Sequence, residues 1–317
     1  MSDLAAALEK SFGVDRVKRG APLAPLTTFK VGGPADILIE TQNENEIVQA
    51  VKLAHAAGVT VTMLGGGSNV LIADGGIRGL VIRTKSGNVA PIGDRLVRAD
   101  AAVTINGLVR WTITHGAAGL EAWAGTPGTV GGAVFGNAHF GGRLIGDLIT
   151  DVRIAGRDGS VTEHPASAMA FGYDRSRLQD TGEVLLTATF RVEPGEPAAL
   201  RRTARESLAY RKRTQPLDSP SAGCIFQNPQ RERDAVPEGI PWSAGALIDR
   251  AGLKGAAVGS ARVSATHGNF IVTDGHASAR EIRRLIERCR RAVRDRFGVG
   301  LREEIVYLGE FDVDTVD

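Results

Sequence analysis

The chain has 317 residues, of which 43% are hydrophobic and 23% are charged, and its formal net charge is +2. This length suits about two domains, and so small a charge indicates no general attraction to nucleic acid or to an anionic membrane. The two cysteines, Cys224 and Cys289, give neither a disulfide framework nor a metal-ligand spacing. Charged residues also interrupt the N-terminal segment where a signal peptide needs an apolar core. We therefore expect a soluble, cytoplasmic protein in a reducing compartment, with no metal site.

Helix and strand signals alternate along the first half of the chain. Apolar residues recur at helical spacing over 44–57 and 104–115, and a glycine follows each segment as a C-cap. Strands are predicted over 59–64, 79–83, 148–155, 160–163 and 183–192. Asp158 and Gly159 separate two of these strands, and such a pair is typical of a tight β-hairpin.

Prolines and a glycine near residue 195 predict a break in the chain. A basic helix over 198–213 follows, and then a run rich in proline and serine over 215–221 that is typical of a linker. Beyond it we predict a second α/β unit, with helices over 244–251 and 279–297 and a strand over 269–273. One face of the last helix is rich in arginine. A nucleic-acid site is one interpretation of that face, but the acidic residues among the arginines favour a solvated polar face.

Two glycine-rich loops are the most informative segments of the sequence. One is the stretch WAGTPGTVGGAVFGN over 123–137, and the other is Gly65-Gly66-Gly67-Ser68-Asn69 after a predicted strand. Glycine allows main chain to approach a flat or phosphorylated ligand closely, and it allows positive φ angles. Neither loop has the G-x-G-x-x-G or G-K-[ST] pattern of the common nucleotide folds. The two loops together predict a large nucleotide cofactor, and simple connecting turns are the alternative.

Further motifs accompany these loops in a fixed order. They are TTFxxGGPA from Thr27, LGGGSN, AGTPGTVGGAV, AGxxFxNP from Ala222, GLKG from Gly252 and LxxEI from Leu301. Together they resemble the UDP-N-acetylenolpyruvoylglucosamine reductase family, and the resemblance runs from about residue 20 to residue 309. The chain is similar to the shorter form of that family, which lacks an inserted loop bearing a tyrosine.

The resemblance implies an α+β fold with a vanillyl-alcohol-oxidase-like (PCMH-type) FAD-binding domain and a smaller α/β substrate-binding domain. We expect the first domain over 1–213, in subdomains of about 1–76 and 77–213, completed by 298–317; the second is expected over 214–297. The family uses FAD and NADPH to reduce the enolpyruvyl ether of a UDP-sugar to UDP-N-acetylmuramate for peptidoglycan. The expected partners are the UDP-sugar and NADPH, with no nucleic acid and no membrane, and we expect a monomer.

The family's functional positions can be transferred residue by residue. The resemblance implies that FAD contacts Thr28, Gly65, Gly66, Gly67, Ser68, Asn69, Thr126, Pro127, Gly128, Thr129, Gly131 and Gly132. It implies that the UDP-sugar contacts Tyr173, Arg213, Asn228, Lys254 and Asn269. The expected catalytic residues are Cys224, Glu304 and Arg175. Adding hydride to an enolpyruvyl group leaves an enolate, which needs hydrogen-bonding or positive groups and one proton donor.

Two of these catalytic positions depart from the family pattern. Cys224 stands where the family has its proton-donating serine, and a thiol is a stronger acid than a hydroxyl. Asp174 stands where the family has an arginine, and a carboxylate there would repel an enolate. We expect Arg175 to replace that arginine, with Arg177 and Arg213 as alternatives. Glu303, beside Glu304, is expected at the surface.

The departures leave two other functions open. An oxidase on the same flavin fold is one alternative, although the second-domain motifs are typical of the reductases. A flavoprotein that binds a nucleotide sugar without turnover is the other, indicated only by Asp174 and Cys224.

Overall fold

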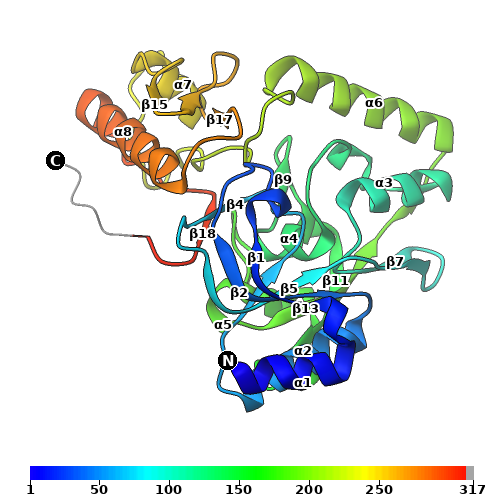
Figure 1. Ribbon diagram of the computed structural model, residues 1–317. Helices are drawn as coiled ribbons and strands as arrows, with labels where there is room; N and C mark the ends of the chain where they lie inside the picture. The colour runs from blue at the N-terminus through cyan, green and yellow to red at the C-terminus, as the bar shows by residue number, and fades with distance from the viewer. Residues whose placement is uncertain (312–317) are drawn as a thin grey trace. The chain divides into compact units, whose positions relative to one another are not determined.

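The computed structural model describes residues 1–311, and the chain forms two compact units (Figure 1). Unit 1 combines Met1–Ala21, Ala35–Gly66 and Arg78–Tyr210, whereas unit 2 combines Pro22–Pro34, Gly67–Ile77 and the chain from Arg211 onwards. The two predicted domains were defined by the ligand that each is expected to bind, FAD or the UDP-sugar. That division of the chain stays a prediction. Residues 312–317 of the predicted segment 298–317 lie outside the described residues.

Unit 1 begins with a four-stranded sheet in the order β1-β2-β5-β3, in which β3 runs parallel to β5. Its elements are α1 (Ser2–Phe12), β1 (Val17–Pro22), β2 (Pro34–Thr41), α2 (Glu44–Ala56), β3 (Val61–Leu64) and β5 (Ile77–Thr84). Leu8 of α1, Ile47 of α2 and Ile39 of β2 share one hydrophobic core, so both helices pack on the sheet. Helix α2 begins where the Asn43 side chain accepts a hydrogen bond from the Glu46 N–H, a typical N-cap.

A five-stranded antiparallel sheet forms the second part of unit 1, in the order β12-β11-β13-β7-β6. Its strands are β6 (Val89–Pro91), β7 (Leu96–Asp100), β11 (Ile149–Ala155), β12 (Val161–Pro165) and β13 (Val184–Arg191). The helices of this part are α3 (Ile105–Thr114), α4 (Val130–Phe135), α5 (Leu178–Thr181) and α6 (Pro197–Thr214). Two short pairs complete it: β8 (Ala117–Ala118) with β14 (Glu193–Pro194), and β9 (His139–Phe140) with β10 (Arg143–Leu144). Trp123 and Phe190 are buried at the centre of its core.

Unit 2 joins N-terminal segments to the C-terminal third of the chain. Its elements are β4 (Val70–Ile72), α7 (Ala244–Arg250), β15 (Ala257–Val258), β16 (Ala261–Val263), β17 (Ile271–Thr273), α8 (Ala279–Phe297) and β18 (Val306–Leu308). Strand β18 pairs in parallel with β4, although about 230 residues separate them in sequence. Phe29 and Leu71 are buried in the same core as Leu285 and Ile286 of α8. The N-terminal segments therefore supply part of the core on which α8 packs.

The predicted elements are confirmed, with ends that differ by no more than two residues. Helix α8 has the predicted bounds, since Ser278 and Glu281 form a capping box at its start and Gly298 ends it with φ of 71°. The predicted hairpin turn is present, and Gly159 has φ of 76° there. Helix α1 was not predicted, because a helix of three turns is marginal by itself and gains its stability from the sheet beneath it. Short 3-10 helices in the described chain cover Val14–Arg16, Ala24–Leu26, Glu121–Trp123, Ile145–Leu148 and Ala166–Met169.

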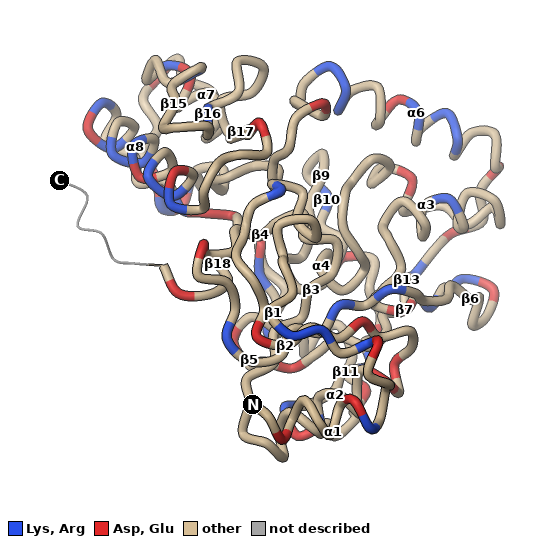
Figure 2. Tube along the Cα trace, in the orientation of Figure 1, with Lys and Arg blue, Asp and Glu red and all other residues tan. Residues whose placement is uncertain are grey.

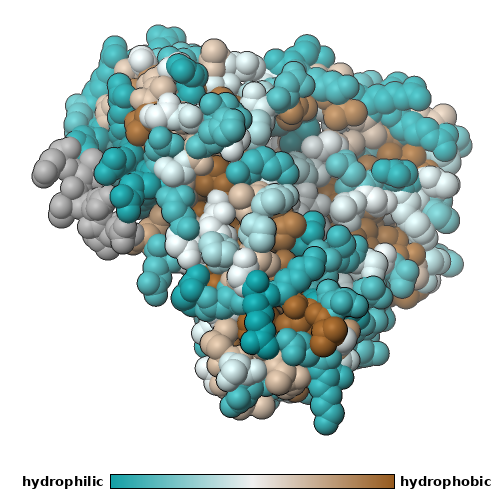
Figure 3. All heavy atoms as spheres, in the orientation of Figure 1, coloured by the Kyte–Doolittle hydropathy of each residue, from teal (hydrophilic) through white to brown (hydrophobic). Residues whose placement is uncertain are grey.

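Few large apolar side chains are exposed at the surface of residues 1–311. On the face drawn in Figure 3, hydrophobic areas are small and lie among hydrophilic ones. The large hydrophobic side chains that are exposed in residues 1–311 come from several elements: Met1, Val14, Ile92, Val161, Tyr210 and Leu217. Among these residues, no helix has the length and apolar character needed to cross a membrane.

Candidate active site

The two glycine loops of unit 1 meet backbone to backbone. A Cβ atom placed on Gly66 would lie 2.8 Å from Gly128 Cα, and one on Gly65 would lie 2.5 Å from Thr129 Oγ1. Gly128 has φ of 103°, a conformation that other residues rarely adopt. Thr129 caps α4 by accepting a hydrogen bond from the Gly132 N–H. Side chains are thus excluded where the loops meet, and this suits the bare main-chain cradle that a dinucleotide such as FAD requires.

The remaining residues of the longer loop are held by local hydrogen bonds. The Thr126 N–H donates to the Trp123 carbonyl, and the Gly131 N–H donates to the Ala101 carbonyl at 2.9 Å. Asn106 of α3 donates from Nδ2 to the Thr126 carbonyl and accepts from the Gly125 N–H. Pro127 is exposed at the tip. These hydrogen bonds tie the loop to Trp123, Ala101 and α3.

In unit 2, the other part of the short loop joins the threonine segment. Thr28 donates to the Gly67 carbonyl from both its N–H, at 3.0 Å, and its Oγ1, at 3.2 Å. Asn69 donates from Nδ2 to the Glu304 carbonyl, and its own carbonyl accepts from the Val306 N–H. Ser68 between them is half-buried. The expected cofactor segment is thus bonded directly to the segment that bears Glu304.

Cys224 and Glu304 lie on neighbouring extended segments of unit 2. The Glu304 N–H donates to the Ile225 carbonyl at 2.8 Å, so the two expected catalytic residues flank one backbone hydrogen bond. On its other side, Cys224 forms an isolated β-bridge with Phe270. Cys224 is partly exposed, and Glu304 is half-buried. The fold therefore joins the backbone segments that carry Cys224 and Glu304, which are 80 residues apart in sequence.

Arg211 is a cation near Cys224 that the sequence analysis did not name. Arg211 is buried, with 6% of its surface exposed, and it interacts electrostatically with Cys224. Burial lowers the pKa of Arg211 to about 10, so the guanidinium is still charged at neutral pH. A fixed positive charge there favours the thiolate that remains after Cys224 gives up a proton. The basic run Arg211-Lys212-Arg213 could have indicated a cation near the Cys224 segment. The sequence alone favoured Arg213 for that role, but Arg213 is exposed.

Three residues expected to bind substrate have defined partners in unit 2. Asn269 is buried and bonds the Phe226 backbone from both ends of its amide, at 2.9 and 2.7 Å, so it orders the Cys224 segment. Asn228 is exposed and accepts at Oδ1 from the Ala244 N–H at the start of α7. Lys254 forms an ion pair with Asp249 at 2.9 Å. Both ends of the Asn269 amide are thus bonded within the protein, and a contact of this residue with the UDP-sugar stays a prediction.

The segment with Tyr173, Asp174 and Arg175 is a tight turn. Arg175 does not point inward: its side chain is 62% exposed and pairs with Asp180 at 2.8 Å. Asp174 does point inward, with 8% exposure and a hydrogen bond between its Oδ1 and His139 Nδ1 at 2.9 Å. Arg177, the alternative to Arg175, donates two hydrogen bonds to the Glu183 carboxylate. These bonds hold the pKa of the Glu183 carboxyl below its usual range. The geometry of this turn gives no support to the expectation for Arg175.

Glu303 is not a surface residue, contrary to the expectation from sequence. Its side chain is 20% exposed and forms ion pairs with Arg290 and, at 3.5 Å, with Arg283. Arg283 also lies over the Tyr307 ring, 4.4 Å from its centroid. Figure 2 shows basic and acidic residues interspersed along α8. Part of the arginine-rich face therefore neutralises the Glu303 carboxylate, which belongs to a residue that forms an isolated β-bridge with Phe226.

The family comparisons define first the class of protein. Residues 35–164 match the model of an FAD binding domain, and residues 215–308 match the C-terminal domain of UDP-N-acetylenolpyruvoylglucosamine reductase. An FAD-dependent oxidoreductase fits both these matches and the glycine cradle. The predicted fold class, with its vanillyl-alcohol-oxidase-like FAD-binding domain, is confirmed.

Similar proteins then define the family. The chain is 40% identical over 300 residues to the UDP-N-acetylenolpyruvoylglucosamine reductase of Synechococcus sp. (strain JA-3-3Ab), covering 94% of this chain and 93% of the relative. It is 41% identical over 291 residues to that of Rubrobacter xylanophilus, covering 91% and 94%. The crystal structure of the Thermus caldophilus enzyme superposes with a TM-score of 0.77 at 32% identity, covering 93% and 99%. The chain belongs to the UDP-N-acetylenolpyruvoylglucosamine reductase family.

Proposed function

We propose that this protein is an NADPH-dependent flavoenzyme that reduces the enolpyruvyl ether of UDP-N-acetylglucosamine-enolpyruvate to UDP-N-acetylmuramate, for peptidoglycan precursor synthesis. The observation that carries the proposal is the hydrogen bond that places Glu304 beside the Cys224 segment, in a chain that also has the glycine cradle. Relatives carrying this enzyme name match more than nine-tenths of the chain. The oxidase and the silent binder are not favoured by any of these observations.

FAD, reduced by NADPH, supplies the hydride when it is bound. Thr28, the glycines of both loops and Thr129 would hold it. Reduction of the enolpyruvyl group would require that hydride at its distal carbon and a proton at the neighbouring carbon. Cys224 carries that proton on its thiol and is left as a thiolate next to the Arg211 charge. Glu304 is the second proposed catalytic residue, and the hydrogen bond from its N–H to the Ile225 carbonyl holds its backbone next to the Cys224 segment.

The UDP-sugar is proposed to contact Tyr173, Asn228, Lys254 and Arg213. Tyr173 has an aromatic ring and a hydroxyl, whereas Lys254 and Arg213 offer positive charge to a diphosphate. Arg213 is exposed at the end of α6, and its side chain is therefore available to a ligand. We also propose that the protein is monomeric and cytoplasmic and that its substrate is a small nucleotide.

The test is an anaerobic stopped-flow experiment in two steps. The purified yellow protein is first mixed with NADPH, and the bleaching of the flavin absorbance is recorded. The enolpyruvyl sugar nucleotide is then added under nitrogen. Rapid return of the oxidised spectrum supports the reductase. Flavin that stays reduced until air is admitted contradicts it and favours an oxidase or a silent flavoprotein.

A further inference from the structure

A hydrogen-bonded turn decides which side chains of the segment around Asp174 face inward. Gly172 and Arg175 exchange two backbone hydrogen bonds, of 3.0 and 3.2 Å, across Tyr173 and Asp174. Asp174 has φ of 55°, and aspartate is one of the few residues that adopt this left-handed conformation readily. A turn has no alternation of faces, so Tyr173 and Asp174 both contact the same neighbour. That neighbour is His139.

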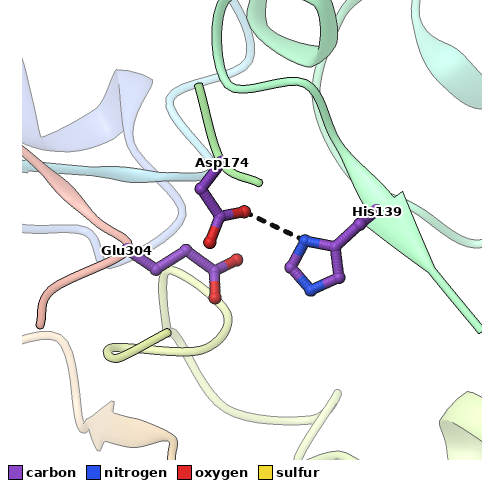
Figure 4. A group of neighbouring side chains, drawn as sticks. All are labelled: His139, Asp174 and Glu304. Atoms are coloured by element: carbon purple, nitrogen blue, oxygen red, sulfur yellow. Dashed lines mark hydrogen bonds and ion pairs between the residues drawn. The ribbon is translucent and has the colours of Figure 1, made fainter. Parts of the chain in front are cut away.

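His139 comes from β9, directly after the glycine loop and α4. Its Nδ1 lies 2.9 Å from Asp174 Oδ1 (Figure 4). Its Nε2 lies 3.4 Å from the Tyr173 hydroxyl, and the two rings are 4.7 Å apart at an angle of 38°. The His139 side chain is 25% exposed, whereas that of Asp174 is 8% exposed. The carboxylate is thus buried behind the imidazole, and the imidazole is the more accessible member of the pair.

Buried contacts hold this pair in place. The buried Asn137 donates to the Gly172 carbonyl at 2.7 Å and accepts from the Gly146 N–H at 2.9 Å. Ser176, also buried, donates from Oγ to the Phe135 carbonyl at 2.8 Å. These bonds fasten the turn to the end of α4 on both sides. The positions of His139 and Asp174 are therefore set before any ligand binds.

We infer that His139, oriented by Asp174, is the cationic group that faces the substrate carboxylate and the developing enolate. This inference rests on the proposed function. An anion that forms during the reaction needs a donor that is already in position. Arg175 faces solvent and Arg177 is bound to Glu183, so neither side chain of this segment is directed to that task. A carboxylate hydrogen-bonded to one ring nitrogen favours the imidazolium form of a histidine and fixes the orientation of the ring.

The chemistry assigns separate roles to the three residues. His139 keeps its protons throughout and presents its positive charge to the substrate, with Nε2 against the Tyr173 hydroxyl, while the proton that forms the new C–H bond comes from Cys224. Asp174 is a positioning residue, because it acts only through His139. Tyr173, whose ring packs on the imidazole, restricts its rotation. The carboxylate at position 174 thus contributes to the reaction by orienting His139, because its Oδ1 is hydrogen-bonded to the imidazole and not directed at the enolate.

The test compares His139→Ala with the matched variant Arg175→Ala in the two half-reactions. We expect His139→Ala to slow oxidation of the reduced flavin by the enolpyruvyl sugar about 100-fold, with reduction by NADPH unchanged. His139→Lys, which keeps a positive charge, should recover at least tenfold of that loss. Arg175→Ala should leave both rates as in the wild type. Flavin content and the thermal unfolding midpoint show whether each variant is folded.

A spectroscopic measurement tests the pair without turnover. Nuclear magnetic resonance of the holoenzyme with ¹⁵N-labelled histidine reports the protons on the ring nitrogens. In the wild type at pH 7.5, both ring nitrogens of His139 should carry a proton. In Asp174→Asn, only one of them should carry a proton. His139→Ala assigns the signal. Wild-type rates in His139→Ala, a loss in Arg175→Ala, or a neutral imidazole in the wild type would each overturn the inference. Failure of the wild type itself to oxidise NADPH with the sugar would instead contradict the proposed function.

Discussion

At the scale of single residues, the two cysteines have opposite environments. Cys224 is partly exposed beside the charged Arg211, whereas Cys289 is 1% exposed in the core of α8. Burial raises the pKa of the Cys289 thiol to about 12. Because the thiolate is the reactive form, only Cys224 combines access with a stabilised thiolate.

Alkylation is expected to distinguish the two thiols. Iodoacetamide at pH 8 should modify Cys224 and leave Cys289 intact, since a thiol with a pKa near 12 is almost entirely protonated at that pH. Peptide mass spectrometry after the reaction measures this directly. The control is Cys224→Ser, which should take up no label while it is folded. Labelling of Cys289 in the native protein would contradict the burial argument.

Substitution of Cys224 tests its role as the proton donor. Cys224→Ala should leave reduction of the flavin by NADPH unchanged and slow the second half-reaction by about 10²- to 10⁴-fold. Cys224→Ser should keep substantial activity, because a hydroxyl can carry the same proton. Stopped-flow absorbance separates the half-reactions. Equal rates in Cys224→Ala and the wild type would remove Cys224 from the mechanism.

At the scale of loops and segments, close backbone approach shapes the candidate cofactor cradle. Gly66 and Gly128 come so near that a Cβ atom on Gly66 would lie 2.8 Å from Gly128 Cα, which is too close for any side chain at position 66. Gly136 ends the same glycine-rich motif, but a Cβ there would lie 3.8 Å from the Gly132 carbonyl, an ordinary contact. The motif therefore contains both a position that requires glycine and one that tolerates alanine.

Gly66→Ala and Gly136→Ala are a matched pair for this cradle. The first should force the loops apart and weaken FAD binding about tenfold, because overpacking of this kind costs about 1–3 kcal/mol. The second should bind FAD as the wild type does. Titration of the apoprotein with FAD, followed by fluorescence, gives both affinities. Equal weakening in the two variants would show that close approach is not the cause.

The C-terminal segment depends on an ion pair as well as on backbone bonds. Arg302 donates two hydrogen bonds, of 3.0 and 2.6 Å, to Asp234, whose side chain is 8% exposed. The Arg302 guanidinium lowers the pKa of the Asp234 carboxyl below its ordinary value of 3.8. The Arg302 carbonyl also accepts from the Gln227 N–H. The pair thus helps to hold the segment that leads to Glu304.

Asp234→Asn should lower the free energy of unfolding by about 1–2 kcal/mol at pH 7, a value reduced for the partial exposure of Arg302. A folded-state pKa below the unfolded value stabilises the fold above about pH 4, and this contribution disappears as the pH falls through the folded-state pKa. The difference between variant and wild type should therefore shrink at acid pH. Urea unfolding at several pH values measures it. A difference that is constant from pH 7 to pH 3 would exclude the ion pair as its source.

At the scale of the whole molecule, unit 2 cannot be assembled from the C-terminal part of the chain alone. Phe29, Val31 and Leu71 are buried in the core that contains α8, and β4 supplies the partner of β18. The Phe29 carbonyl also accepts a hydrogen bond from Thr273. Without these N-terminal segments, the C-terminal region would expose part of its core and lose a strand pairing.

The fragment 211–317 should therefore lack cooperative unfolding. We expect its near-ultraviolet circular dichroism to be weak and its thermal transition to be broad. The control is the full chain cleaved once after the exposed Leu217, which retains every segment of unit 2. It should stay associated and unfold cooperatively. A sharp transition in the isolated fragment would contradict the dependence on residues 22–34 and 67–77.

Several helices and strands, the two glycine loops, the family and the candidate cofactor could be predicted from the sequence alone, because these depend on local periodicity and on short motifs, whereas helix α1 could not. The tertiary structure decided how the segment around Asp174 is turned. A strand would alternate its side chains, but a hydrogen-bonded turn with positive φ directs Asp174 towards His139 and leaves Arg175 in solvent. It also decided that Arg211, and not Arg213, lies near Cys224. Burial and pairing depend on contacts between residues far apart in sequence, and no local pattern encodes them.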